Sequence, residues 1–313
     1  MKRFGLIGAA GYIAPRHMQA IKDTGNILEV ALDPSDSVGI LDFYHPKASF
    51  FTEIERFDRH IDKLRRRDRG LDYISICSPN YLHDSHIRMA LRNDCDVICE
   101  KPLVLNPENM HFLKILEEES GKKINNILQL RLHDAIQTLK KEIDPQRIYD
   151  IDLSYIAGRG LWYHYSWKGD QTKSGGLATN IGVHFFDMLT WIFGPVIQNK
   201  LYISKNDVIS GYLHLERANV KWFLSCNPKH IPPKVKESGQ RTFRSLNING
   251  KEFDFSKGFT DLHTKSYTHI LEGKGFSIED VKPSIELVST IRHMKTHNID
   301  GDSHPFLIQG AYK

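Results

Sequence analysis

The fold is decided by residues 3–14, where the apolar run RFGLI (3–7) leads directly into the glycine turn GAAGYIA (8–14). The run predicts a β-strand, and the stretch from Arg16 to Thr24, which Gly25 ends, predicts a helix. Glycine lets a backbone approach a pyrophosphate, and the start of a helix offers unpaired N–H groups and a positive dipole end. The spacing Gly-x-x-Gly-x-x-Ala is one residue longer than the usual dinucleotide turn, so the turn by itself is a weak signal.

Asp33 strengthens the dinucleotide interpretation. It follows a second predicted strand, Asn26 to Leu32, and stands about 20 residues beyond the glycine turn. A carboxylate at that place hydrogen-bonds the adenosine ribose hydroxyls and repels a phosphate on that ribose, which favours NAD over NADP. The alternative is that Asp33 only forms the turn before Pro34.

The first 125 residues alternate apolar runs with amphipathic stretches. Strands that alternate with helices predict a parallel sheet with right-handed crossovers, here a Rossmann domain at residues 1–125. Beyond the elements above, we expect strands at 71–77, 96–99 and 123–128 and helices at 83–92 and 108–120.

The remainder, residues 126–313, has a different pattern. Strand-like runs follow one another with turns and few helices between them, which predicts an open, mainly antiparallel sheet in an α+β domain. The Asn249-Gly250 pair is typical of a hairpin turn. We expect strands at 148–156, 199–204, 210–216, 220–227, 244–249 and 252–255, and helices at 183–193 and 282–296. The predicted fold class is therefore α/β, a Rossmann domain followed by this second domain.

Composition narrows the classes of protein that remain. The chain has 313 residues, 40% of them hydrophobic and 26% charged, which is typical of a two-domain globular protein. A net charge of +4 is too low for a nucleic-acid binder. Four cysteines form no disulfide framework, so we expect reduced core residues and a cytoplasmic location. No apolar run suits a membrane span, the N-terminal glycines argue against a signal peptide, and no cysteine–histidine pattern predicts a metal site.

Two further motifs stand at predicted strand ends, where open α/β sheets bind ligands. Residues 78–83 (SPNYLH) follow the strand at 71–77, and Glu100-Lys101-Pro102 follows the strand at 96–99. A lysine beside a rigid proline at this edge would be poised over a nicotinamide. The alternative for an arbitrary lysine is an exposed loop charge.

Taken together, the motifs resemble the Gfo/Idh/MocA family of oxidoreductases, along the whole chain and in order. Within that family they look closer to one branch, the UDP-N-acetyl-glucosaminuronate 3-dehydrogenases of surface-polysaccharide (O-antigen) synthesis. The stretches that carry the resemblance are GAAGYIAPR (8–16), YISICSPNYLH (73–83), CDVICEKPL (95–103), NILQLR (126–131), SWKGD (166–170), GGLATNIGVHFFDML (175–189) and GFTDLH (258–263).

The resemblance implies NAD as the cofactor and assigns residues to it. The implied cofactor-binding residues are Gly8, Ala10, Gly11, Tyr12, Ile13, Asp33, Ser78, Pro79, Asn80, His83, Glu100, Lys101 and Gln129.

The resemblance also implies two catalytic residues, Lys101 of the Glu-Lys-Pro motif and His184. The family usually shows Asp-x-x-x-His, whereas this chain has Asn180 four residues before His184. An amide cannot accept a proton, so Asn180 is left to bind the substrate or the histidine. A lysine with an ordinary pKa of about 10.4 needs a nearby positive charge to act as a base at neutral pH, whereas a histidine near 6.5 does not. Either residue could therefore remove the proton.

An acidic substrate requires a cationic partner. The candidates are Arg131, Arg159 and Lys168, and each has the alternative of being an ordinary surface charge. An aromatic cluster near two of them could border the sugar or the base, or could be core packing. Its members are Trp162, Tyr163, Tyr165 and Trp167.

The function implied by the resemblance is NAD-dependent oxidation of the 3-hydroxyl of UDP-N-acetyl-glucosaminuronate to a ketone. It also implies a homotetramer built through the second domain, and in some relatives 2-oxoglutarate reoxidises a retained cofactor. No nucleic-acid or membrane partner is expected. The alternatives are a dehydrogenase of another sugar or polyol on the same fold and, less favoured, a nucleotide-sensing protein without catalytic activity.

Overall fold

The computed structural model describes residues 1–255 and 258–310, and it separates into two compact units. The first unit comprises Met1–Leu132 together with Thr260–Lys282. The second comprises His133–Phe259 and the described chain from Pro283 onward. The predicted division at residue 125 differs from this in two respects. The first segment continues to Leu132, and a segment from late in the chain returns to the first unit, where its apolar side chains belong to that unit's core.

The sheet of the first unit is six-stranded, with every pair parallel and the order β3-β2-β1-β4-β5-β6. This is the order of a Rossmann fold, so the predicted fold is confirmed. Its strands are β1 (Arg3–Ile7), β2 (Ile27–Leu32), β3 (Ser49–Phe51), β4 (Tyr73–Ile76), β5 (Asp96–Cys99) and β6 (Ile124–Asn126). Its helices are α1 (Ala14–Asp23), α2 (Ile40–Tyr44), α3 (Ile54–Arg65), α4 (His83–Arg92), α5 (Glu108–Ser120) and α11 (Leu262–Leu271), with short turns η1 (Asn80–Leu82) and η2 (Gln129–Leu132).

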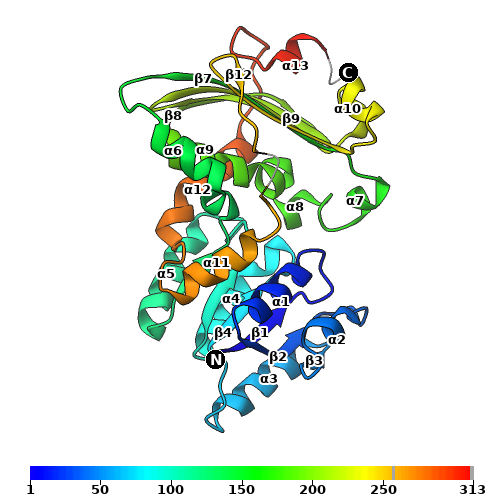
Figure 1. The fold of residues 1–313 in the computed structure, drawn as a ribbon, viewed down its shortest axis with the longest axis vertical. Helices are drawn as coiled ribbons and strands as arrows, with labels where there is room; N and C mark the ends of the chain where they lie inside the picture. Colours follow the sequence, from blue (N-terminus) through cyan, green and yellow to red (C-terminus); the bar gives the residue numbers. More distant parts are fainter. Residues whose placement is uncertain (256–257, 311–313) are drawn as a thin grey trace. The chain divides into compact units, whose positions relative to one another are not determined.

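The returning helix α11 packs against α1, as Figure 1 shows within this unit. Tyr267 of α11 is fully buried, and its ring lies 5.8 Å from that of Phe4 in β1. Phe4 in turn stacks on Tyr73 of β4 at 5.0 Å. The hydrophobic core of the Rossmann sheet is therefore closed by a residue from the last fifth of the chain.

The second unit is built on another six-stranded sheet, of order β12-β11-β7-β10-β9-β8. Only the β7–β10 pair is parallel, so the predicted mainly antiparallel sheet is confirmed. Its strands are β7 (Tyr149–Ala157), β8 (Val196–Ser204), β9 (Val208–Leu215), β10 (Ala218–Ser225), β11 (Thr242–Ile248) and β12 (Lys251–Glu252). Its helices are α6 (Asp134–Glu142), α7 (Leu161–Tyr165), α8 (Gln171–Ser174), α9 (Val183–Phe193), α10 (Pro233–Glu237) and α13 (Pro305–Ile308), with the π-helical turn η3 (Ala178–Gly182) and the short turn η4 (Pro228–His230).

Adjacent residues of β10 cover the two faces of this sheet, because strand side chains alternate. Trp222 contacts Phe186 of α9 on one face, and Phe223 contacts Phe306 of α13 on the other. Helix α12 (Ile278–His293) passes from the first unit to the second at Pro283, and was expected at 282–296. No helix among the described residues is long and apolar enough to cross a bilayer.

Candidate functional site

The glycine turn after β1 leaves no room for a side chain at its first position. Gly8 has a φ of +91°, and a Cβ there would lie 2.6–2.7 Å from the backbone of Cys77 and Ser78. Gly11 donates its N–H to the Gly8 carbonyl oxygen at 3.0 Å, which tightens the turn before α1 begins. The side chain of Tyr12 points into solvent, whereas Ile13 is partly buried. The backbone of this turn is thus open to close approach by a ligand.

Asp33 lies beside the glycine turn, as the sequence predicts for a ribose-binding carboxylate. Its Oδ2 accepts the Ala10 N–H at 2.9 Å, and its Oδ1 accepts the Ser35 N–H at 2.8 Å. A carboxylate has about four acceptor positions, so these two bonds leave capacity for ribose hydroxyl groups. The Ser35 bond is also the turn that the alternative interpretation expected, and the two roles are compatible.

The motif SPNYLH forms the turn between β4 and α4. His83 is fully buried, and its Nδ1 lies 2.7 Å from the Pro102 carbonyl oxygen while its Nε2 lies 2.9 Å from that of Ser78. It therefore ties the end of β4 to the Glu-Lys-Pro turn. The Ser78 hydroxyl is bonded to His86 Nδ1 at 2.9 Å, Asn80 is buried, and Pro79 is partly exposed. The structure gives His83 a bridging position inside the fold.

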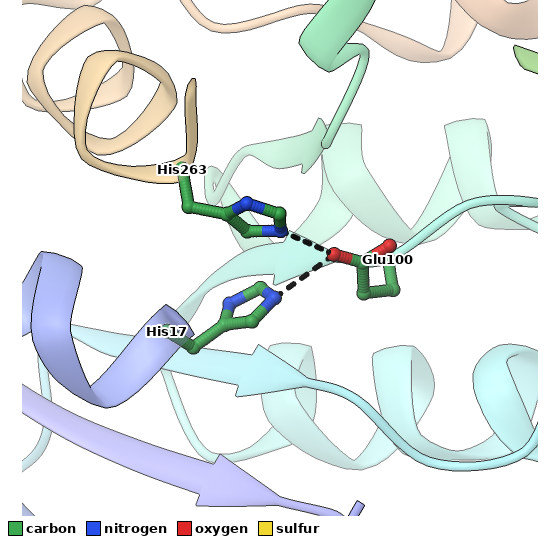
Figure 2. A group of neighbouring side chains, drawn as sticks. All are labelled: His17, Glu100 and His263. Atoms are coloured by element: carbon green, nitrogen blue, oxygen red, sulfur yellow. Dashed lines mark hydrogen bonds and ion pairs between the residues drawn. The ribbon is translucent and has the colours of Figure 1, made fainter. Parts of the chain in front are cut away.

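The Glu-Lys-Pro turn follows β5 and contains a cis Lys101–Pro102 peptide. Lys101 is partly buried, whereas Glu100 is buried and lies between two imidazoles, as Figure 2 shows. Burial by itself would raise the pKa of Glu100, but hydrogen bonds from His17 and His263 hold it well below the usual range. The negative charge beside Lys101 is thus retained inside the protein.

Gln129 lies after the last strand of the Rossmann sheet, at the start of η2. Its Oε1 is buried and has no hydrogen-bond partner among the described residues. Buried polar atoms are normally paired, so this oxygen indicates a missing donor. Three groups follow strands at the carboxyl edge of one sheet: the glycine turn at Gly8, the Asp33 carboxylate and the Gln129 oxygen. Together they fit a dinucleotide such as NAD.

His184 and Asn180 belong to the second unit and lie next to each other on consecutive helical turns. Asn180 is part of the π-helical turn η3, and His184, partly buried, is in the first turn of α9. Residues four apart on a helix share a face. Asn180 donates from Nδ2 to the Tyr163 hydroxyl at 3.0 Å. π-helical turns are rare and occur often at functional sites.

Two of the predicted cationic residues also lie in this unit. Lys168 is partly buried, with its Nζ 4.3 Å from the Trp167 ring centroid and 6.0 Å from that of Trp162. Burial lowers the pKa of Lys168, and the charge of Arg159 lowers it further. Arg159 itself is exposed. An anion bound near this pair would relieve their repulsion.

The third cationic candidate, Arg131, is held differently. It belongs to the first unit and is buried, with Nη1 donating to Asp280 Oδ1 at 3.1 Å and Nη2 donating to the Asp280 carbonyl at 2.8 Å. Its guanidinium also lies 5.3 Å from the centre of the Phe276 ring. Arg131 is therefore not the ordinary surface charge that the alternative expected, and its contacts give it a structural role within the first unit. Arg131 as a substrate ligand stays a prediction.

The aromatic cluster contains both buried and exposed members. Tyr163 is buried and contacts Asn180, whereas Trp162 and Tyr165 are exposed by 56% and 87%. Two residues were missed altogether: His17 and His263, which contact Glu100. His263 ends one of the stretches that carry the family resemblance and His17 directly follows another, but nothing in their spacing indicates that they meet.

Comparison with known proteins shows the family of the chain. Residues 2–127 match the Gfo/Idh/MocA family model described as an oxidoreductase family with an NAD-binding Rossmann fold. Residues 140–230 match that family's C-terminal alpha/beta domain. Among curated proteins, the glucose-6-phosphate 3-dehydrogenase of Bacillus subtilis is 25% identical over 99% of this chain and 78% of its own length.

Two solved structures of the WlbA (WbpB) dehydrogenase from Thermus thermophilus are more similar. The one in complex with NAD and alpha-ketoglutarate is 46% identical, with a TM-score of 0.95 over 98% of this chain and 100% of its own. The one in complex with NAD and UDP-GlcNAcA is 45% identical, with a TM-score of 0.94 over the same shares.

Proposed function

We propose that this chain, which belongs to the Gfo/Idh/MocA family of oxidoreductases, oxidises the 3-hydroxyl of UDP-N-acetyl-glucosaminuronate to a ketone with NAD. One observation carries the proposal: nearly the whole chain is similar to the Thermus thermophilus dehydrogenase whose structure was solved with NAD and UDP-GlcNAcA. The Rossmann unit of this chain has the donor and acceptor groups that such a cofactor requires. Its second unit holds cations that suit an acidic sugar.

The chemistry divides between cofactor and protein. When bound, the oxidised nicotinamide accepts a hydride from the carbinol carbon. The protein must then take the proton from the hydroxyl oxygen, and Lys101 Nζ and the His184 imidazole are the two bases in the proposal. Asn180 is a neutral donor and acceptor, so its role is to orient the substrate or His184, not to accept the proton.

Arg159 and Lys168 are the proposed partners of the uronate carboxylate. Lys168 is partly buried against Trp167, which holds its amine in place, and its pKa is lowered by burial and by Arg159. A carboxylate would raise that pKa again and gain an ion pair with the amine. This pair is therefore a reason to expect the uronate in preference to the neutral sugar.

Further parts of the proposal concern the cofactor cycle and the assembly. We include 2-oxoglutarate as the oxidant of the reduced cofactor, because a similar structure was solved with alpha-ketoglutarate. The protein would form a homotetramer through the sheet of the second unit. A cytoplasmic location is supported by its four cysteines, which are all free and buried.

A second candidate is oxidation of a sugar phosphate at the same carbon. It is favoured by the 25% identity to glucose-6-phosphate 3-dehydrogenase over almost the whole chain. Both candidates use the same fold, cofactor and bases, and they differ in the anion that the substrate presents.

The decisive experiment measures NADH formation by the purified protein with NAD and each of three substrates: UDP-GlcNAcA, UDP-N-acetylglucosamine and glucose 6-phosphate. We expect turnover with the uronate to exceed the others by roughly 100-fold, because its carboxylate pairs with Arg159 and the partly buried Lys168. Equal rates with the first two substrates would contradict acid recognition, and preference for glucose 6-phosphate would establish the second candidate. An absorbance scan of the protein as purified, before and after 2-oxoglutarate, checks for retained reduced cofactor.

Three variants test the assigned residues. Lys101→Met and His184→Gln should each lower kcat by roughly 100-fold or more, since a positioned base contributes that much. Lys168→Met should raise KM for the uronate and leave KM for UDP-N-acetylglucosamine unchanged. Lys47→Met, which removes an exposed lysine of the first unit, is the matched control and should behave as the native enzyme.

A further inference from the structure

Three side chains from distant parts of the chain meet behind Lys101. His17 of α1 and His263 of α11 both point at Glu100, which follows β5, as Figure 2 shows. Their Nε2 atoms lie 3.0 and 2.9 Å from the same carboxylate oxygen, Oε1. All three residues are buried, and two of the three come from segments with no assigned role.

The protonation of this cluster follows from its contacts. An ionised carboxylate only accepts hydrogen bonds, so both histidines must carry hydrogen on Nε2. Neutral His17 then accepts at Nδ1, where the Tyr267 hydroxyl lies 2.8 Å away and must donate. Tyr267 in turn accepts from the Ser75 hydroxyl at 2.6 Å. Burial lowers the pKa of His17 despite its bond to Glu100, which agrees with a neutral ring.

The other oxygen of Glu100 contacts the residue that we assign to catalysis. Glu100 Oε2 accepts the backbone N–H of Lys101 at 3.3 Å. The Glu100 backbone is also fixed, because its N–H donates to Ile76 O at 3.0 Å and its carbonyl accepts from Asn126 Nδ2 at 3.3 Å. One carboxylate thus connects the Lys101 turn to α1 and to the returning helix α11.

The same atoms also suggest a metal site, since the three ligand atoms lie within 4.8 Å of one another. The geometry favours hydrogen bonding. Metal bonds of about 2.0–2.2 Å in a tetrahedral site keep ligands roughly 3.3–3.5 Å apart, farther than the 2.9 and 3.0 Å found here. Metal binding would also move hydrogen to His263 Nδ1, a buried atom without a partner among the described residues, and a buried N–H without an acceptor is costly.

We propose that His17 and His263 are positioning residues: through Glu100 they hold the backbone of Lys101 in a fixed place relative to the glycine-turn helix. The two imidazoles stabilise the buried carboxylate, and the carboxylate fixes the lysine turn. The consequence for catalysis rests on the proposed function. The consequence for the Lys101 backbone does not.

The test compares two amide replacements of His263 in the full-length protein. Gln has its amide nitrogen near the position of the histidine Nε2 and can donate to Glu100, whereas Asn is too short to reach. Both replacements carry a neutral amide and differ by one methylene group, so the variants differ mainly in this hydrogen bond. His111→Asn, at an exposed histidine of α5, is the control for a surface substitution.

The first readout needs no substrate: hydrogen exchange of the Lys101 amide, followed by mass spectrometry of the peptide that contains it. We expect exchange to be roughly 10-fold faster in His263→Asn and close to native in His263→Gln, since only the Asn variant releases the carboxylate. The second readout is kinetic. With UDP-GlcNAcA, His263→Asn should lower kcat by roughly 10- to 100-fold with little change in KM, because misplacing a catalytic group has such an effect.

Each outcome decides the proposal. Equal exchange in the Gln and Asn variants would overturn it, as would a divalent metal bound stoichiometrically to the purified protein and lost from His263→Gln. If neither variant nor the native protein oxidises the uronate, the proposed function is wrong. The hydrogen-exchange comparison still tests whether His263 positions the Lys101 backbone. Should the Asn variant not fold, His17→Gln against His17→Asn repeats the comparison from the other side of Glu100.

Discussion

At the scale of single residues, the cofactor unit depends on a position that only glycine can occupy. Gly8 combines a positive φ with a Cβ position already filled by the backbone of Cys77 and Ser78. Backbone atoms cannot move aside as a flexible side chain can. The glycine motif therefore determines how close a pyrophosphate can come, and a methyl group is enough to change it.

We expect Gly8→Ala to abolish NAD binding, because its Cβ would force apart the ends of β1 and β4. Fluorescence titration with NADH measures the loss. We expect an affinity at least 100-fold weaker, because the Cβ displaces the backbone that binds the pyrophosphate. Gly25→Ala is the matched control: Gly25 also has a positive φ, +73°, but nothing lies within 4 Å of its Cβ position. If Gly8→Ala binds NADH as tightly as Gly25→Ala, the filled Cβ position at Gly8 does not control cofactor binding and the prediction is wrong.

We expect the free energy of unfolding to fall in two stages as the pH is lowered, because the buried residues His86 and Glu100 have shifted pKa values. Burial lowers the pKa of His86 from 6.5 to about 4, so the unfolded chain binds a proton there between those pH values and the folded chain does not. Stability should fall by up to about 1.4 kcal/mol per pH unit across this window for each such histidine. The contribution of Glu100 acts lower: its pKa is depressed by His17 and His263, so its stabilisation is present above about pH 4.5 and lost as the pH falls further.

Thermal unfolding as a function of pH checks both stages. His86→Gln should flatten the profile between pH 6.5 and 4, and Glu100→Gln should flatten it below pH 4.5 at the expense of stability at neutral pH. A native profile that is level from pH 6.5 to 4 would contradict the argument for His86.

At the scale of elements, most strands and helices follow from the hydrophobic pattern. The predicted helices at 83–92, 108–120 and 183–193 coincide with α4, α5 and α9, and the strand at 96–99 with β5. Several elements were not predicted, among them the short strand β3, the returning helix α11 and the π-helical turn η3. A π turn has no sequence pattern of its own, because it arises where packing inserts one extra residue into a helix.

The η3 turn gives an element-scale prediction. A Cβ on Gly182 would lie 2.7 Å from the Phe186 ring and 2.8 Å from a Leu224 methyl, so Gly182→Ala should push the turn away from the sheet. We expect kcat to fall by roughly 10-fold because His184 follows directly, with about 1–3 kcal/mol of lost stability.

NADH affinity should not change in this variant, since the glycine turn and Asp33 belong to the other unit. Steady-state kinetics and NADH titration of Gly182→Ala and of Gly301→Ala, whose Cβ position is open, make the comparison. Loss of NADH binding in Gly182→Ala with unchanged kcat would be the opposite of this expectation.

At the scale of the whole molecule, the Rossmann unit is discontinuous in sequence. Tyr267 fills its core, and its hydroxyl reaches His17, 250 residues earlier in the chain. Residues 260–282 are therefore as much a part of the cofactor unit as the glycine turn, although the sequence pattern places them in the second domain.

Tyr267→Ala should destabilise the first unit by about 3–5 kcal/mol, the usual cost of removing a buried aromatic ring, and weaken NADH binding. Tyr267→Phe keeps the ring and should lose only about 1–2 kcal/mol with the hydroxyl bonds. Chemical unfolding monitored with and without NADH measures both. Tyr165→Ala, at a residue 87% exposed, is the control, and a Tyr267→Ala variant as stable as this control would contradict the role of α11.

The sequence by itself determined what local pattern can encode: the alternation of strands and helices, the glycine turn, the carboxylate after β2, and the motifs that identify the family. These depend on residues close together in the chain, and periodicity and turn chemistry report them directly. The tertiary structure alone decided which distant side chains meet, namely His17, Glu100 and His263 around one carboxylate oxygen, and Arg131 with Asp280. Such pairs depend on how elements pack, and a long-range contact leaves no spacing in a single sequence from which it could be read.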